Sequence, residues 1–241
     1  MDTNHPWHGW PQLPLPSARP EDGGWHELSH VLSEGLKRTP SFPKPRIEKL
    51  LCMPGDRLNL TEIQMVCHFG THLDAPCHFI LDAPALHQIP LERMYGPGVV
   101  WRIEVEPDGL IEPTHLAAAR PAARPGDIVL IDSGFHLDIE TDRYERHPSL
   151  SPDAARWLVD QGVKLLGVDF ATPDLAHGRR GEGFNWPVHH ILLSRGVLIG
   201  EHLTNLRPLS GRRVEVIFLA LNIQHADGAP ARVIARPAAD G

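Results

Sequence analysis

The stretch HFGTHLDAPCHF, residues 68–79, decides how the centre of this chain can fold. Four side chains able to bind a metal stand an even number of residues apart and would share one face of a strand: His68, His72, Asp74 and His78. The Gly, Thr and Pro among them disfavour a helix. A straight strand would hold the Cα atoms of His68 and His72 roughly 13 Å apart, too far for both imidazoles to bind one ion at about 2.1 Å. We therefore predict an extended segment that bends at Gly70, which tolerates positive φ.

Two imidazoles and a carboxylate are the ligand set of a catalytic zinc or manganese site that keeps one position open for water. A single histidine is more often a surface or hydrogen-bonded residue, but four correlated positions around a Gly-Thr turn favour the metal. Cys67 and Cys77 have the opposite parity. We expect them to be core thiols rather than ligands or nucleophiles.

Outward from this segment, strands alternate with helices in the second half of the chain. Residues 151–162 predict a helix, with Ser151 as N-cap and Gly162 past its end. Residues 188–196 predict a short helix that ends at Gly196. Apolar runs bounded by Gly, Pro and Asp predict strands at 99–105, 127–134, 163–170, 197–203 and 214–221.

The N-terminal region has a different character. Residues 1–24 are rich in Pro, Gly and Trp and predict an irregular arm, followed by one catalytic domain over 25–241. Three tryptophans here should pack on neighbouring structure, because each carries a large apolar surface: Trp7, Trp10 and Trp25. Residues 25–35 predict a strand and a turn. The proline-rich residues 39–45 predict an extended pocket rim.

Composition narrows the class of partner. The net charge is −7, with Lys and Arg scattered singly, so the chain offers no basic stripe for nucleic acid. No apolar run reaches the roughly 18 residues that cross a bilayer, and the start lacks the pattern of a signal peptide. We expect a cytoplasmic protein with three reduced cysteines and no membrane partner.

The pattern His-x-Gly-Thr-His-x-Asp-x-Pro-x-His resembles the signature of the putative cyclase family, which includes bacterial kynurenine formamidase and isatin hydrolase. Further blocks resemble that family at 25–35, 124–134, 147–174 and 187–206, so the likeness spans about residues 25–235. The resemblance implies an α/β fold: a single domain with mixed β-sheets and flanking helices in a swivelling β/β/α architecture. It also implies a homodimer or homotetramer.

The resemblance also implies roles for individual residues. His68, His72 and Asp74 match the ligands of a first metal ion, and Asp74 matches the bridging carboxylate of two-metal members. His189 and Glu201 match the remaining ligands, and the helix followed by a returning strand can bring them together. His190 and His202 stay open as alternatives to His189.

Three further residues receive roles from this comparison. His78 matches the general acid/base, and an imidazole beside a metal can move a proton near neutral pH. Asp169 is expected either behind a metal-bound histidine or in a turn. Phe42 corresponds to an aromatic residue that lines the substrate pocket, although the family's Trp-Pro-Gly pattern is changed here, which weighs against kynurenine formamidase activity itself.

The predicted function is hydrolysis of a small-molecule amide, either an aryl formamide or a cyclic amide, or of a lactone. One or two divalent ions, zinc or manganese, would activate water. The alternative is a biosynthetic cyclase or dehydratase that uses the same metal as a Lewis acid. A metal-binding module without catalysis is disfavoured by the apparently complete ligand set.

Overall fold

The structure is a computed structural model that describes residues 24–238. The predicted arm of residues 1–24 therefore lies, apart from Gly24, outside the described residues, as do Trp7 and Trp10. Trp25 packs under the guanidinium of Arg236, 4.7 Å from its ring centroid, but stays 41% exposed. Its burial is thus only partial.

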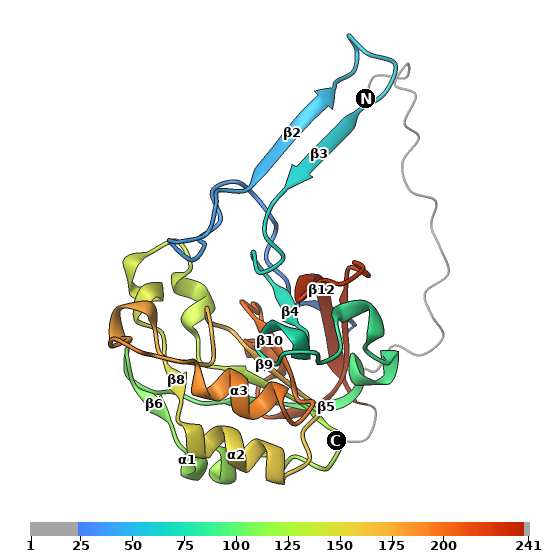
Figure 1. The fold of residues 1–241 in the computed structure, drawn as a ribbon. Coiled ribbons are helices and arrows are strands. Elements are labelled where there is room, and N and C mark those ends of the chain that lie inside the picture. The colour runs from blue at the N-terminus through green and yellow to red at the C-terminus, as the bar shows by residue number, and fades with distance from the viewer. Residues whose placement is uncertain (1–23, 239–241) are drawn as a thin grey trace.

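One mixed eight-stranded sheet forms the centre, in the order β1-β12-β11-β5-β7-β9-β10-β4 (Figure 1). Strand β4 also pairs with β12, so the sheet closes into a barrel and leaves only β1 outside the ring. The strands are β1 (His26–Glu27), β4 (His72–Asp74), β5 (Tyr95–Arg102), β7 (Ile128–Asp132), β9 (Leu165–Val168), β10 (Leu198–Glu201), β11 (Arg212–Ala220) and β12 (Gly228–Pro237). The predicted mixed α/β class is confirmed.

The pairs β5–β7, β7–β9 and β9–β10 are parallel. The pairs β10–β4, β4–β12, β12–β11 and β11–β5 are antiparallel. Every residue of β7 and β9 is buried, as expected for parallel strands covered on both faces. One apolar core lies between the sheet and the helices, around Trp101 and Phe170. A second core includes Leu73, Val216 and Phe218 of the closed sheet.

Three α-helices cover one side of the sheet (Figure 1): α1 (Pro113–Ala118), α2 (Pro152–Asp160) and α3 (Pro187–Leu193). Both predicted helices are confirmed. The Ser151 hydroxyl accepts a hydrogen bond from the Ala154 amide at 3.1 Å, and Gly162 and Gly196 follow their helices with φ of +72°. These local caps explain why the sequence located both helices.

A long hairpin was not predicted. Strands β2 (Arg46–Leu51) and β3 (Leu60–Gln64) pair with each other and, among the described residues, with no other strand, and they project from the body (Figure 1). Their sequences mix charged and apolar residues without the alternation that marks a half-buried strand. Strands β6 (Leu110–Ile111) and β8 (Ser149–Leu150) form a second small sheet.

The remaining turns of helix are short 3₁₀ segments: η1 (Pro76–His78), η2 (Leu86–Gln88), η3 (Leu91–Arg93), η4 (Phe135–Asp138), η5 (Asp142–Arg146), η6 (His177–Arg179) and η7 (Arg207–Leu209). Within residues 24–238 no helix has the length and apolar character needed to span a bilayer.

Candidate metal centre

The chain bends just before β4, where Gly70 has a φ of +64°. A Cβ at this position would collide with the Leu32 side chain, so glycine is required for space as well as for conformation. The bend returns the Gly70 carbonyl to the ring of His72, whose Nδ1 donates to it at 2.8 Å. The predicted bend is therefore present, and it orients the first histidine of the strand.

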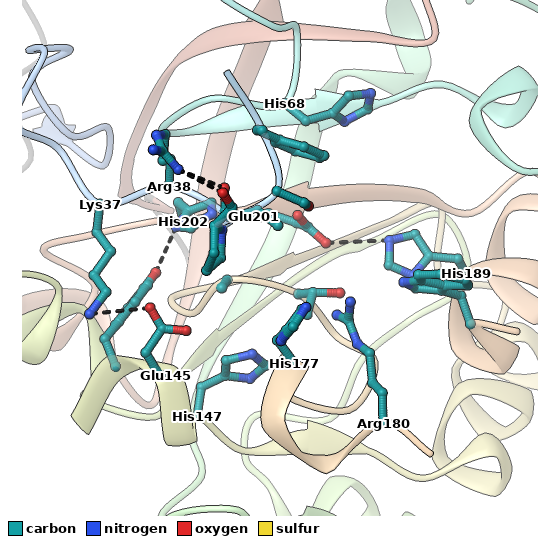
Figure 2. A pocket seen from close by; sticks show the side chains of 18 of the residues that line it. Lys37, Arg38, His68, Glu145, His147, His177, Arg180, His189, Glu201 and His202 are labelled. Carbon is teal, nitrogen blue, oxygen red and sulfur yellow. Dashed lines mark hydrogen bonds and ion pairs between the residues drawn. The ribbon is translucent and has the colours of Figure 1, made fainter. Parts of the chain in front are cut away.

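Four side chains converge at the end of the barrel, and we call them the inner cluster: His72, Asp74, His189 and Glu201. Glu201 stands directly opposite His72 in the antiparallel pairing of β10 with β4. His189 comes from the first turn of α3 and faces Glu201 (Figure 2). None of the four is more than 6% exposed. Residues more than a hundred positions apart are thus brought to one buried point.

Hydrogen bonds on the far side of each ring fix the direction of the two imidazoles. Because the Gly70 carbonyl can only accept, His72 carries its proton on Nδ1. His189 Nδ1 likewise donates to Asp174 at 2.6 Å. The Nε2 atoms of both rings therefore face the carboxylates of the inner cluster, the orientation in which a neutral histidine binds a metal.

The separations in the inner cluster suit ligands of a shared cation. His72 Nε2 lies 3.3 Å from Asp74 Oδ1 and 3.3 Å from Glu201 Oε2. His189 Nε2 lies 3.5 Å from Asp74 Oδ2 and 3.3 Å from Glu201 Oε1. Atoms held about 2.1 Å from one ion at tetrahedral angles are about 3.4 Å apart. Direct charged hydrogen bonds would be shorter, at about 2.8 Å.

Among residues 24–238, three buried atoms of the inner cluster find no hydrogen-bond partner: His72 Nε2, Asp74 Oδ2 and Glu201 Oε1. Leaving such atoms unpaired in a protein interior is costly. All three belong to residue types that bind zinc or manganese. The residues present therefore fit a divalent cation.

Charge coupling in the inner cluster is strong. Burial alone would lower the pKa of His72, but Asp74 and Glu201 outweigh it and raise this pKa to about 10. Burial and Asp74 would raise the pKa of Glu201, but His189 and His72 lower it to about 2. The two carboxylates thus stay ionised only next to positive charge, which either protons on the imidazoles or a cation supplies.

Three side chains nearer the solvent form what we call the outer cluster: His68, His78 and Asp227. His68 spans two carboxylates, with Nδ1 2.8 Å from Asp74 Oδ1 and Nε2 3.0 Å from Asp227 Oδ2. His78 stacks on His68 with ring centroids 3.9 Å apart, and its Nδ1 lies 3.4 Å from Asp227 Oδ2. Burial would lower the pKa of His68, but the hydrogen bonds to Asp227 and Asp74 raise it to about 9.

The predicted ligands therefore divide into two groups. His68 was expected beside His72 on a first ion, yet its nitrogens contact Asp74 and Asp227, whereas His72 faces Glu201 and so groups with His189. Asp74 belongs to both groups, with Oδ1 toward His68 and Oδ2 toward His189.

A cavity of about 270 Å³ opens onto both clusters (Figure 2). His68, His78, His189 and Glu201 line it, as does Phe42 from the predicted rim. Phe79 and Trp186 add apolar surface, and the ring centroid of Phe79 lies 4.5 Å from that of His189. A planar apolar molecule could therefore lie against these rings with its reacting group at the clusters.

The two alternatives to His189 lie elsewhere. His190 is exposed on α3 and contacts Phe79, with ring centroids 5.4 Å apart. His202 is buried and its Nδ1 lies 2.8 Å from the Tyr144 hydroxyl. Burial, together with the charge of His72, lowers the pKa of His202 to about 3. His202 is thus a neutral residue of the pocket wall.

Asp169 does not stand behind a predicted ligand. It accepts hydrogen bonds from the Ser133 amide and hydroxyl and the Gly134 amide, and it contacts His136 Nδ1 at 3.0 Å. In the described chain Asp169 thus contacts the loop after β7 rather than the inner cluster. Cys67 and Cys77 are free, half-buried and packed against the core.

Two aspartates that contact these histidines were missed by the sequence analysis. Asp174 accepts from the ring of His189 and from the amides of Val188 and His189. Asp227 lies 159 positions from His68, in a bend directly before β12. The only sequence signal for Asp174 was its place in a block with family resemblance, and no sequence signal pointed to Asp227.

Comparison with known protein families gives one match. The model described as Putative cyclase matches residues 26–175. Kynurenine formamidase of Bordetella petrii is 33% identical over 184 residues, which cover 76% of this chain and 83% of that protein. Kynurenine formamidase of Salinibacter ruber is 31% identical over 185 residues, 76% of this chain and 82% of that protein.

Solved structures show the same fold. A structure described as a predicted metal-dependent hydrolase from Bacillus stearothermophilus superposes with a TM-score of 0.72 at 26% identity and covers 88% of this chain and 97% of its own. An isatin hydrolase bound to the product analogue thioisatinate gives a TM-score of 0.79 at 21% identity, over 89% of this chain and 92% of its own.

Proposed function

This chain belongs to the putative cyclase family, and we propose that it is a metal-dependent hydrolase of an amide, either an aryl formamide or a cyclic amide, or of a lactone. One observation carries the proposal: two imidazole nitrogens and two carboxylates face one another at 3.3–3.5 Å in a buried cluster with three unpaired atoms. The relatives named kynurenine formamidase and isatin hydrolase support the substrate classes.

The inner cluster would hold the ion, with His72, Asp74, His189 and Glu201 as ligands, and zinc or manganese suits this donor set. A divalent ion, when bound, supplies Lewis-acid polarisation of the substrate carbonyl and lowers the pKa of water. A second ion would share Asp74, because its Oδ1 faces the outer cluster.

His78 is the proposed general base and acid. Its side chain is 24% exposed and lines the cavity, and its Nδ1 lies near Asp227. Nε2 is therefore the nitrogen available to a substrate. In the proposed reaction His78 takes a proton from the attacking water, a C–O bond forms, the C–N or ring C–O bond breaks, and His78 returns the proton to the leaving atom.

The decisive experiment combines metal analysis with product analysis. We expect purified protein to carry at least one divalent ion per chain and to hydrolyse at least one of N-formylkynurenine, isatin and a small lactone panel. Mass spectrometry should show that each product has gained one water, and chelation should abolish turnover. Mass-neutral ring closure or loss of water would instead support the cyclase or dehydratase alternative. Metal-loaded protein that converts none of the panel would contradict the proposed substrate classes.

We also propose a homo-oligomer, homodimer or homotetramer, with a second copy packed on the hairpin β2–β3. An isolated two-stranded hairpin is marginal in water, and this one exposes Leu60 by 46% and Ile63 by 56%. Sedimentation should show an oligomer that the double substitution Leu60→Glu and Ile63→Glu dissociates. A monomeric wild-type chain, or an unaffected oligomer in the variant, would contradict this assignment.

A further inference from the structure

Two arginines that line the cavity, Arg38 and Arg180, form no ion pair within the described residues. The other basic side chain with a long stem, Lys37, is paired with Glu145 at 3.2 Å. Within residues 24–238, neither Arg38 nor Arg180 has a carboxylate within ion-pair distance. Arg38 NH1 donates to the carbonyls of Thr39 and Pro40 at 3.1 and 3.2 Å, which gives it a role in its own turn. Arg180 has no such use for its terminal nitrogens.

Three contacts hold the Arg180 side chain in place. Its Nε donates to the Leu175 carbonyl at 2.8 Å. Its guanidinium carbon lies 5.4 Å from the ring centroid of Trp186 and 5.5 Å from that of Phe184, within the range of cation–π attraction. Figure 2 shows the side chain extending from its ribbon into the pocket, with the guanidinium at the free end. The side chain is thus oriented before any ligand arrives.

The donors of Arg180 are mostly unused. An arginine offers five N–H donors, and in the described chain only the one on Nε has a hydrogen-bond partner. The two terminal nitrogens form the planar fork that binds a carboxylate through two parallel hydrogen bonds. The Arg180 side chain is partly buried, and this burial lowers the pKa of Arg180 although the charges of Asp174 and Glu201 act to raise it. The fork is therefore partly removed from water.

We propose that Arg180 is an anion-binding residue of the pocket and that the substrate carries a carboxylate in addition to its reacting carbonyl. The apolar surfaces of Phe79 and Trp186 lie on the same cavity as the inner cluster. The substrate class is therefore an aryl amide or lactone with a carboxylate on its apolar body. The nature of the reacting group rests on the proposed function, whereas the anion site does not depend on it.

Binding of two small probes tests the anion site without turnover. Benzoate and benzamide have nearly the same shape and differ in charge, so both are titrated calorimetrically into the metal-loaded protein. Arg180→Gln should weaken benzoate binding by about 10-fold or more and leave benzamide within about twofold, because only the anion loses charged hydrogen bonds. Arg180→Lys should lie between, because an ammonium lacks the fork.

Arg179→Gln is the matched control. Arg179 is the exposed neighbour whose NH1 donates to the Asp108 carbonyl at 3.3 Å, and it does not line the cavity. This variant should bind both probes as the wild type does. Unchanged benzoate binding in Arg180→Gln would overturn the proposal, since the metal or another cation would then hold the carboxylate. Equal loss of both probes would overturn it too, because Arg180 would then shape the pocket rather than bind charge.

Turnover separates this proposal from the hydrolase assignment. With formanilide and the three formamidobenzoates as substrates, Arg180→Gln should raise KM for the preferred carboxylate substrate by about 10-fold while the constants for formanilide stay within about twofold. Failure of all four to react, with benzoate selectivity intact, would count against the amide substrate and leave the anion site standing. Hydrolysis without any preference for a carboxylate substrate would contradict the anion site and leave the proposed hydrolase activity standing.

Discussion

The inner and outer clusters share Asp74 but differ in burial and in hydrogen bonding. Every member of the inner cluster is nearly inaccessible, whereas the side chains of His68, His78 and Asp227 are 11%, 24% and 49% exposed. Three atoms of the inner cluster lack a hydrogen-bond partner in the part of the chain that the structure describes. In the outer cluster, His68 has carboxylates on both of its nitrogens.

This contrast assigns different chemistry to the two clusters. One unpaired nitrogen and two unpaired carboxylate oxygens, buried at ligand spacing, favour a bound cation. Histidines next to solvent and to a half-exposed carboxylate can exchange protons with a substrate. We therefore expect substitutions in the inner cluster to remove its ion, and substitution of His78 in the outer cluster to remove turnover while the ion of the inner cluster stays.

Glu201→Gln should have the largest effect. The amide keeps the shape of the side chain but removes one of the two charges that face His72 and His189. We expect metal content to fall from at least one ion per chain to almost none, and kcat/KM to fall by more than about 100-fold, since even residues behind metal ligands are worth 10- to 100-fold. Elemental analysis after dialysis measures the metal. Glu145→Gln, a pocket carboxylate paired with Lys37, should keep its metal; full occupancy in Glu201→Gln would remove this residue from the ligand set.

His78→Ala should separate the clusters most clearly. The variant lacks the proposed proton carrier but keeps all four members of the inner cluster, so metal content should stay at the wild-type level. We expect kcat to fall by about 100-fold or more, the usual contribution of general acid–base catalysis. Steady-state kinetics and elemental analysis of the same sample provide the comparison. Retained turnover would exclude His78 from proton transfer, and loss of metal would place it among the ligands.

Asp174→Asn should have an intermediate effect. Asp174 fixes the ring of His189 through Nδ1 and so presents Nε2 to the inner cluster. Weakening this contact should reduce metal affinity by about 10- to 100-fold, measured by competition with a chromophoric chelator. Asp169→Asn is the matched control, because Asp169 is equally buried but serves the loop at Ser133. It should lower the Tm and leave metal affinity within about twofold, and the reverse pattern would restore the role first predicted for Asp169.

How far the sequence could predict this site depends on how local each feature is. The bend at Gly70 and the common face of His72 and Asp74 follow from seven consecutive residues, because strand parity and positive φ are properties of the backbone itself. The caps of α2 and α3 are local in the same sense. The convergence of His189 and Glu201 with that strand came from family resemblance, since periodicity alone does not fix which strands become neighbours.

The residues that were missed depend on the tertiary fold. Asp227 contacts His68 only because β12 pairs with β4 when the barrel closes, and β12 itself was not predicted. Asp174 and Asp169 lie five positions apart after the same strand, and only the position of α3 decides which of them contacts His189. The hairpin β2–β3 was not predicted because its strands are mostly exposed in the described structure, and exposed strands show no apolar alternation.

The pH dependence of stability should show the smallest effect, and it compares the inner cluster with and without its metal ion. In metal-free protein the folded pKa values of His68 and His72, about 9 and about 10, exceed their unfolded value of 6.5. Their contribution to stability is therefore fully present below pH 6.5 and is lost as the pH rises through 9 to 10. A bound metal ion would replace those protons in the inner cluster, so the stability of metal-loaded protein should fall less as the pH rises.

Thermal unfolding at pH 6.5, 7.5 and 9 measures this difference. We expect the Tm of the metal-free form to fall by roughly 3 °C or more over this range relative to the loaded form, the shift that about 1 kcal/mol produces in a chain of this size. His68→Gln removes one of the two titrating groups and should flatten the metal-free curve. A metal-free Tm that rises with pH would mean that the imidazoles are neutral beside ionised carboxylates, which would leave the inner cluster without positive charge and undermine its assignment.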